Sequence, residues 1–348
     1  MFATLVLFLG AAEAVLWLLG LPEKHRPHSH PPQFWAFPDT DYLYLNLPSS
    51  RIRFVYDGDP RGYFGPGNQV DHHTNSLGFR GGEFSQEKPR DTVRFLFLGD
   101  SFTFGEGVRD EDTLPEEFRR VELNRNAFPG KQVEALNLGV GGFNTAQEAA
   151  LLRDRGIALR PDRIIVDYSL NDAEPALFFR NRSGGIERRD RELEVPEYLG
   201  SPATPTPLSF LRLTSLAYRA YWNLAATRRT VEYYKDLYRA GSPGWDQTRA
   251  ALSDIAATAR SGGAKVTVMI FPVLFHLNSG YPFLDLHAKV RDAAHAAGLE
   301  CLDLYPVYRG YSGPELWVHP TDQHPNEVAL RLAARRLADF LATDRKSR

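Results

Sequence analysis

Residues 93–105, VRFLFLGDSFTFG, join a run of apolar residues to a short polar turn enclosed by glycines. The run VRFLFL has the length and the aromatic and β-branched content of a buried strand. Ser101 follows it, so its hydroxyl would lie beyond the strand and its N–H at a helix N-terminus, where negative charge is stabilised. A serine in this place is equally typical of a helix cap. The stretch therefore predicts a strand–turn–helix unit, and other residues must decide its chemistry.

The rest of the chain continues the alternation of strands and helices. Further buried strands are predicted at residues 133–138, 163–168, 265–271 and 300–304. Helical patterns lie at residues 114–124, 145–157, 246–261 and 284–297, and an amphipathic pattern at 330–341 comes last. Strands that alternate with helices form a parallel sheet covered on both faces, and function gathers beyond the carboxyl ends of its strands. We therefore expect an α/β fold with a five-stranded parallel sheet and a site at those ends.

Composition excludes several classes of protein. The chain has 348 residues, 41 Lys+Arg against 43 Asp+Glu, a formal net charge of −2 and a single cysteine. One cysteine cannot form an internal disulfide, and a near-neutral chain lacks the basic footprint of a nucleic-acid binder. We therefore expect neither a disulfide scaffold nor a nucleic-acid partner. The same charge balance favours a neutral substrate over a strongly anionic polymer.

An apolar run at the N-terminus has the length of a membrane-spanning helix. Residues 2–21, FATLVLFLGAAEAVLWLLGL, contain one ionisable side chain, Glu13. Its cost at the centre of a span, roughly 3 kcal/mol, is outweighed by the leucines, valines and phenylalanines around it. A cleaved signal peptide would begin with basic residues, and a buried core helix does not fit the Pro-rich segment that follows. We expect an uncleaved transmembrane anchor at residues 1–22 and a linker at residues 23–45.

The orientation of this anchor follows less directly from the sequence. We expect a single-pass protein whose residues after the linker lie on the extracytoplasmic side of the membrane. Lys24 and Arg26 come directly after the span, and by the positive-inside rule they favour the opposite orientation. Two charges carry little weight in that rule, so the side remains an expectation to be tested.

Three predicted strand ends carry residues suited to acyl-transfer chemistry. Ser101 follows the first strand, the glycine loop NLGVGGFN at residues 137–144 ends the second, and Asn171 follows the third. A backbone N–H in the glycine loop and the Asn171 side-chain amide could both donate to an oxyanion beside the serine. The loop imitates a dinucleotide fingerprint, but its last position is Asn144 instead of glycine, and residues 99–105 do not complete a P-loop. We therefore expect an oxyanion site rather than a nucleotide site.

A histidine-containing stretch, HPTDQHPN at residues 319–326, stands directly before the last helix. His324 is held by prolines two residues after Asp322, which suits a general base oriented by a carboxylate. Zinc is the competing use of these groups. Metal sites require three or four clustered ligands, and only His319, Asp322 and His324 are local here. We therefore expect neither a metal nor a cofactor.

Taken in order, these blocks resemble the SGNH, or GDSL-type, serine hydrolases. The resemblance covers residues 75–341, and the lead-in NSLGFRG at residues 75–81 is similar to that of bacterial membrane-anchored members. It implies a flavodoxin-like three-layer α/β/α sandwich, in agreement with the predicted alternation. The hydrolase domain would occupy residues 91–345 with an insertion at residues 173–245, after a lead-in at residues 46–90.

The resemblance also implies a role for each site residue. The catalytic triad would be Ser101, His324 and Asp322, and the oxyanion hole would be formed by Ser101, Gly142 and Asn171. The family usually places its aspartate three residues before the histidine, where this chain has Thr321. Asp322, two residues before His324, is the nearby carboxylate and would take the orienting role.

The implied activity is that of a membrane-anchored serine esterase that cleaves an O-acyl ester on a carbohydrate. The same triad would serve an O-acyltransferase that acetylates an envelope polysaccharide, and the sequence does not separate the two. Two further hypotheses belong to other classes of protein. One is a catalytically silent glycan-binding module that uses the same cleft, and the other is a structural anchor whose segment 173–245 docks a partner.

Overall fold

The computed structural model describes residues 2–19, 34–181, 185–189, 211–278 and 280–346. The predicted five strands are present as β5 (Thr92–Gly99), β6 (Gln132–Asn137), β7 (Arg163–Tyr168), β10 (Lys265–Ile270) and β11 (Glu300–Asp303). They form one parallel sheet with the order β11–β10–β7–β5–β6. β7 and β6 therefore flank β5, and the loops that follow these three strands meet at one edge of the sheet.

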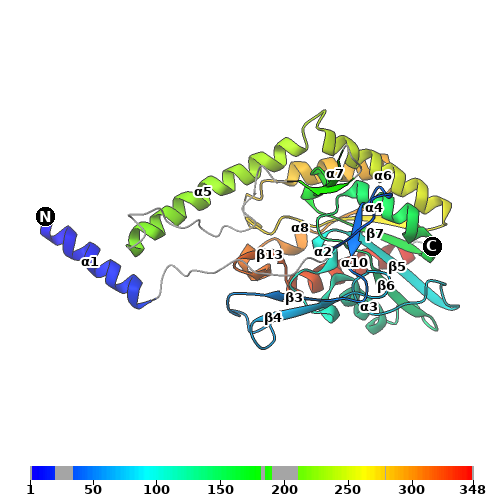
Figure 1. Ribbon diagram of the computed structural model, residues 1–348, viewed down its shortest axis with the longest axis horizontal. Coiled ribbons are helices and arrows are strands. Elements are labelled where there is room, and N and C mark those ends of the chain that lie inside the picture. The colour runs from blue at the N-terminus through cyan, green and yellow to red at the C-terminus, as the bar shows by residue number, and fades with distance from the viewer. Residues whose placement is uncertain (1, 20–33, 182–184, 190–210, 279, 347–348) are drawn as a thin grey trace.

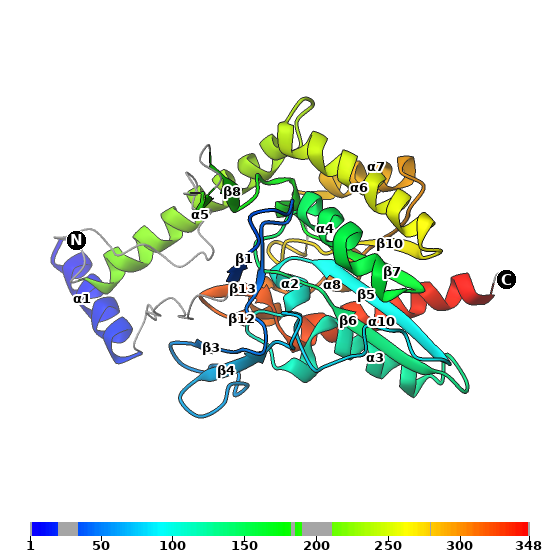
Figure 2. The ribbon, with the colours of Figure 1, turned by 45° about the vertical axis from the view of Figure 1, so that its right-hand side comes forward.

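Helices cover both faces of the sheet and complete the three layers of an α/β/α sandwich (Figure 2). One face carries α3 (Leu114–Asn124) and α10 (Glu327–Lys346), which pack against each other. The other face carries α4 (Thr145–Leu151), α6 (Pro243–Ser261) and α7 (Leu284–Ala296). All eight residues of β5 are buried between the two helical layers, as the apolar run predicts.

The helix predicted at residues 145–157 is divided in the structure. α4 ends at Leu151, a π-helical segment covers Leu152–Gly156, and a 3-10 turn covers Ile157–Leu159. A Cβ on Gly156 would lie 3.1 Å from the Leu152 side chain and 3.3 Å from that of Leu96 on β5. The wider turn therefore brings a glycine backbone against the sheet, where a larger residue would crowd its neighbours.

The segment before β5 is built from short antiparallel pairs. β1 (Phe34–Ala36) pairs with β2 (Tyr44–Asn46), and β3 (Arg51–Val55) pairs with β4 (Gln69–His73). Residues 42–46 are buried, although the sequence analysis placed most of them in a linker. Their apolar side chains belong to the hydrophobic core of the domain, so the globular part of the chain begins earlier than residue 46. Residues 20–33 of the expected linker lie outside the described residues.

In its described residues, the expected insertion between β7 and β10 contains two short strands and one long helix. β8 (Phe178–Arg180) pairs with β9 (Ile186–Arg188), and α5 (Arg212–Leu237) leads into α6. α5 projects from the body of the molecule toward the N-terminal helix (Figure 1). Residues 182–184 and 190–210 of the expected insertion lie outside the described part.

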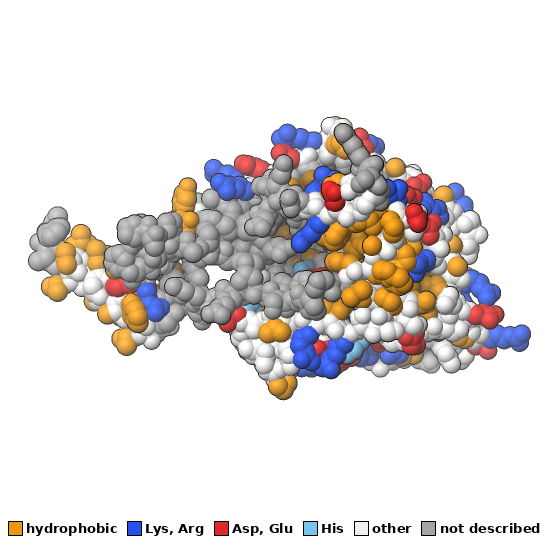
Figure 3. All heavy atoms as spheres, viewed as in Figure 1, with side chains coloured by type: hydrophobic (Ala, Val, Ile, Leu, Met, Phe, Trp, Pro, Cys, Tyr) orange, Lys and Arg blue, Asp and Glu red, His pale blue; other side chains and the backbone are white. Residues whose placement is uncertain are grey.

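The N-terminal helix α1 (Phe2–Leu18) lies beside the start of α5, away from the sheet (Figures 1 and 2). Glu13 accepts hydrogen bonds from the backbone N–H groups of Arg212 (2.5 Å) and Leu213 (2.8 Å), and so caps α5. Exposed apolar side chains line α1 (Figure 3). Among the residues that the structure describes, no helix combines the length and the apolar character needed to cross a membrane.

Candidate active site

Ser101 lies at the carboxyl end of β5, as the sequence predicts, and begins the short helix α2 (Ser101–Phe104). Asp100 caps this helix, because its Oδ1 accepts the Phe102 N–H at 2.8 Å. Gly99 permits the sharp turn between strand and helix. A Cβ at this position would lie 2.2 Å from Thr103 Oγ1 and 3.1 Å from the Asp167 carbonyl oxygen. A larger residue would therefore push α2, and the serine with it, away from the end of the strand.

His324 and Asp322 come from the C-terminal part of the chain and lie beside Ser101. Both lie on β13 (Asp322–Pro325), which pairs with β12 (Trp317–His319) in an antiparallel hairpin. Nε2 of His324 lies 2.9 Å from Ser101 Oγ, and its Nδ1 lies 2.5 Å from Asp322 Oδ1. The structure therefore brings the three residues into one chain of hydrogen bonds, at the distances that a nucleophile, a base and an orienting carboxylate require.

The two-residue spacing between Asp322 and His324 follows from the strand they occupy. Side chains at positions i and i+2 of a β-strand point to the same face, so both groups face Ser101. Thr321, at the position where the family usually has its aspartate, is buried, and its Oγ1 lies 2.8 Å from His319 Nδ1. His319 Nε2 in turn lies 3.2 Å from the Asp57 carbonyl oxygen, so this histidine holds the hairpin against the lead-in. Within the described residues, no group of three or more His, Cys, Asp or Glu side chains could hold a metal ion.

Tyr56 contacts the triad and was not anticipated from the sequence. It follows β3, and its hydroxyl donates a hydrogen bond to Asp322 Oδ2 at 2.8 Å. The ring is buried and stacks on Phe64, with 4.4 Å between centroids. Burial, together with the adjacent Asp322 carboxylate, raises the pKa of Tyr56 well above its usual value, so the phenol remains a donor. No local pattern marks this contact, because 266 residues separate the partners.

The expected oxyanion donors follow β5, β6 and β7. Gly142 lies in the loop after β6 with φ +77, and a Cβ there would come within 2.8 Å of the Leu177 side chain. Asn171 follows β7, and its Nδ2 donates to Asp100 Oδ2 at 2.8 Å. Among the described residues, neither the Ser101 N–H nor the Gly142 N–H has a hydrogen-bond acceptor. Both remain available to a developing negative charge at this edge of the sheet.

Asp100 thus connects the turn that carries Ser101 to the loop that carries Asn171. The sequence analysis did not assign this role to Asp100. Its two carboxylate oxygens accept from Phe102 and Asn171, and its side chain is buried. Burial raises the pKa of Asp100, while the Asn171 and Phe102 hydrogen bonds oppose that rise. The Gly-Asp-Ser order was the available signal, because it places an acceptor directly before the serine.

Glu106 is a second carboxylate at the histidine. Its Oε2 lies 3.5 Å from His324 Nε2, the same ring nitrogen that contacts Ser101. The Glu106 N–H donates to the Ser101 carbonyl oxygen at 3.1 Å, which ties this residue to α2. Its side chain is 11% exposed, so the carboxylate lies at the edge of the site rather than in open solvent.

Further acidic residues lie buried beneath the loops after β5 and β7. Asp167 Oδ2 accepts from Thr103 Oγ1 at 2.8 Å, while its Oδ1 has no partner in the described structure. Burial raises the pKa of Asp167 to about 8, and it raises those of Glu148 and Asp172 well above their usual values. Burial therefore disfavours the charged form of each of these three acids.

The family profile of the GDSL-like lipases and acylhydrolases matches residues 97–331 of the chain. The matched region contains Ser101, Asn171, Asp322 and His324, and it excludes Tyr56. No curated protein sequence matches the chain significantly.

Three solved structures are similar to this chain at low sequence identity. A two-domain esterase active on acetylated mannans has 15% identity and a TM-score of 0.42, and the alignment covers 72% of this chain but 49% of that one. An α/β hydrolase from the metagenome of Lake Arreo, Spain, has 14% identity and a TM-score of 0.44, with 72% and 95% covered. An acetylxylan esterase from Geobacillus stearothermophilus has 14% identity and a TM-score of 0.42, with 71% and 93% covered. This chain therefore spans about half the length of the first of these proteins.

Proposed function

The chain is a member of the GDSL-like lipase/acylhydrolase family, and from this premise we propose that it cleaves O-acyl esters of a carbohydrate through the triad Ser101, His324 and Asp322. Membership makes it a serine hydrolase that acts on ester bonds. The observation that carries the assignment of residues is the 2.9 Å contact between Ser101 Oγ and His324 Nε2. The carbohydrate part of the proposal extends what the sequence resemblance implies.

The first half of the reaction acylates the serine. His324 Nε2 accepts the hydroxyl proton while Ser101 Oγ attacks the ester carbonyl carbon. His324 becomes an imidazolium, and its Nδ1–H donates to Asp322, whose second oxygen is held by Tyr56. The carboxylate orients the ring and stabilises its positive charge without taking the proton.

The oxyanion of the tetrahedral intermediate would be held at the sheet edge. The donors are the N–H groups of Ser101 and Gly142 and the side-chain amide of Asn171. Nδ2 of Asn171 has two hydrogens, so donation to Asp100 leaves one for the oxyanion. Each such donor typically contributes about 3–4 kcal/mol to the lowering of the barrier. His324 then protonates the leaving alcohol, and water removes the acyl group from Ser101 by the same steps.

Hydrolysis of p-nitrophenyl acetate tests the triad directly. We expect Ser101→Ala and His324→Ala to reduce turnover by several orders of magnitude, and Ser101→Ala to abolish labelling by a fluorophosphonate. Equal rates in the wild type and both variants would contradict the proposal and favour a silent binding module. Addition of a glycan acceptor to the same assay separates the two acyl acceptors, because a transferase would release an acylated sugar as well as p-nitrophenol.

We also propose that α1 attaches the enzyme to a membrane, with the catalytic domain on the extracytoplasmic side. Leu7 and Leu18 on this helix are 74% and 87% exposed, and water is an unfavourable environment for such surfaces. The double substitution Leu7→Lys and Leu18→Lys should move the protein from the membrane fraction to the supernatant. Retention of the variant in the membrane fraction would contradict the attachment, and protease added to intact cells tests the side.

A further inference from the structure

Glu106 places a carboxylate beside His324 Nε2, the nitrogen that protonates the leaving alcohol in the proposed mechanism. Its Oε2 lies 3.5 Å from His324 Nε2, and Ser101 Oγ lies 2.9 Å from the same nitrogen. Asp322 already serves the other ring nitrogen. The reacting face of the imidazole therefore has two oxygen neighbours, and the triad explains only one of them.

The loop that carries Glu106 is held rigidly from several sides. Gly105 and Gly107, its neighbours, have φ values of +81 and +77. A Cβ on Gly107 would lie 2.4 Å from Val318 Cγ1 and 2.6 Å from Tyr56 Oη, so the backbone is packed against the catalytic hairpin. The Gly107 N–H also donates to His72 Nε2 at 3.2 Å. This packing fixes the backbone from which the Glu106 carboxylate extends.

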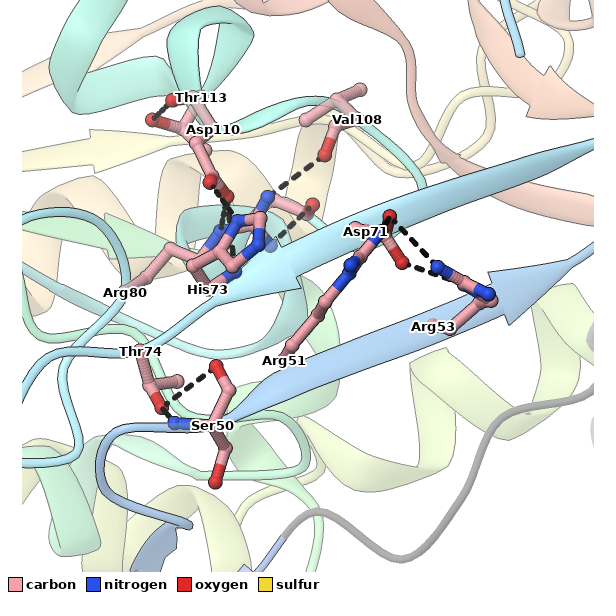
Figure 4. A network of polar contacts seen from close by, with 11 residues as sticks. Ser50, Arg51, Arg53, Asp71, His73, Thr74, Arg80, Val108, Asp110 and Thr113 are labelled. Atoms are coloured by element: carbon pink, nitrogen blue, oxygen red, sulfur yellow. Dashed lines mark hydrogen bonds and ion pairs between the residues drawn. The ribbon is translucent and has the colours of Figure 1, made fainter. Parts of the chain in front are cut away.

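Arg80 donates hydrogen bonds to the backbone of the same loop (Figure 4). Its buried guanidinium donates to the carbonyl oxygens of Val108 at 2.8 Å and Gly105 at 3.3 Å, and to Asp110 Oδ1 at 2.8 Å. Its positive charge also interacts with Glu106, and the attraction to that carboxylate opposes the lowering of the Arg80 pKa by burial. The buried guanidinium therefore holds the backbone of the Glu106 loop and attracts the Glu106 carboxylate.

The position of Glu106 has a consequence for the leaving alcohol. In the proposed mechanism His324 Nε2 donates its proton to the ester oxygen, which must therefore come within hydrogen-bond distance of that nitrogen. A hydroxyl on the neighbouring carbon of the same alcohol lies only one carbon–carbon bond further on. Glu106 Oε2 lies 3.5 Å from Nε2 and could accept a hydrogen bond from that hydroxyl.

We propose that Glu106 accepts a hydrogen bond from a free hydroxyl adjacent to the ester, and that the enzyme thereby selects monoesters of vicinal diols. This inference rests on the proposed function and narrows its substrate class. A sugar with an acyl group next to an unmodified hydroxyl fits the requirement, as does a glycerol monoester. An alcohol with an apolar group in that place would offer Glu106 no hydrogen bond, so the contact that distinguishes the diol monoester would be lost.

Three acetate esters of similar size test the proposal. 2-Hydroxyethyl acetate supplies the adjacent hydroxyl, 2-methoxyethyl acetate keeps the oxygen without the donor hydrogen, and n-propyl acetate replaces the hydroxyl by a methyl group. We expect the wild type to favour 2-hydroxyethyl acetate over each of the others by about tenfold or more in kcat/KM. Glu106→Gln should reduce this preference several-fold, and Glu106→Leu should remove it.

Glu111→Gln is the matched control, since Glu111 is an exposed glutamate in the segment that follows the same loop. It should leave the preference at its wild-type value. If Glu106→Leu does not fold, Glu106→Gln carries the test alone, because it keeps the size of the side chain and removes its charge.

The outcomes separate this inference from the proposed function. A wild type that hydrolyses all three esters equally while Ser101 still reacts with a fluorophosphonate would overturn the inference and leave the triad intact. If Glu106→Gln lowers kcat/KM for all three esters in the same proportion, Glu106 acts on the imidazolium rather than on the substrate, and the inference is wrong. Loss of both labelling and turnover in the wild type would instead contradict the proposed function.

Discussion

Buried acidic residues lie on two sides of Ser101, and the two sets differ in the number of hydrogen-bond donors around their carboxyl groups. On the hairpin side, Asp322 accepts the His324 ring N–H, the His324 backbone N–H and the Tyr56 hydroxyl. On the sheet side, both carboxylate oxygens of Glu148 lack a hydrogen-bond partner in the described structure, as does one oxygen of Asp167. The two groups are equally buried, so hydrogen bonding makes the difference. Three donors stabilise the Asp322 carboxylate, whereas burial without such donors raises the pKa of Glu148 and Asp167.

The largest effect is expected at Asp322, because its role depends on charge as well as shape. Asp322→Asn keeps the size of the side chain but can present an N–H to His324 Nδ1, which would stabilise the wrong tautomer. In a serine protease triad the corresponding change lowers kcat by about 10⁴-fold, and we expect a loss of about 10³- to 10⁴-fold here. Steady-state kinetics on p-nitrophenyl acetate measures it. An unchanged kcat would show that another group orients His324.

Asn171→Ala should have the next largest effect. The substitution removes one oxyanion donor and leaves Asp100 Oδ2 without its partner, so kcat should fall by about 10²- to 10³-fold with little change in KM. Asn124→Ala is the control, because Asn124 lies at the exposed end of α3 and has no proposed role in catalysis. A rise in KM at constant kcat would contradict an oxyanion role and indicate substrate binding instead.

Tyr56→Phe should reduce kcat by about tenfold, the value of one hydrogen bond to a charged acceptor. The ring remains to fill the space against Phe64, so stability should change little. Tyr63→Phe is the matched control, because Tyr63 lies in the same loop and donates instead to Asp112 at 2.7 Å. The pH profile of kcat/KM should shift in the Tyr56 variant and stay in place in the control. Identical profiles in the two variants would mean that Tyr56 is only structural.

Asp167 should affect stability and its pH dependence rather than catalysis. Its pKa rises from 3.8 to about 8 in the folded protein, so between these values only the folded state holds the proton. The stabilisation is complete below the unfolded pKa and is lost as the pH rises, at up to about 1.4 kcal/mol per pH unit. Asp167→Asn should flatten this slope.

Urea unfolding at several pH values between 5 and 8 measures the slope. Asp254→Asn, at an exposed position on α6, provides the baseline. A wild-type stability that rises over this range would mean that Asp167 ionises in the fold, and the contrast between the two acid groups would disappear.

The sequence was sufficient where the decisive pattern is local. The apolar run before Ser101 predicted β5, and the rule that sites lie at strand ends brought Ser101 and Asn171 to one edge of the sheet. His324 could be assigned because prolines and an aspartate surround it. The strand pairing of residues 322–325 was not predicted, although it explains why an aspartate two residues away faces the same side as the histidine.

The sequence was insufficient where contacts join distant segments. Tyr56 has no neighbours in the sequence that mark it as part of a site, and only the packing of the lead-in on the hairpin places it there. Glu106 lies five residues after Ser101, but no local pattern shows that its carboxylate reaches His324. Glu13 is a similar case at the N-terminus. In the sequence it was a charge in an apolar run, and in the structure it caps α5, a helix about 200 residues later.

The Tyr56 contact also determines how much of the chain an experimenter should keep. The family match begins at residue 97, after the hairpin of β3 and β4 and the phenol that bonds Asp322. A fragment trimmed to that boundary would lose both the Arg80 anchor of the Glu106 loop and the buried residues 42–46. The stability and kinetics measured on such a fragment would therefore differ from those of the full chain. The smallest faithful piece for expression therefore extends well upstream of the recognisable motif.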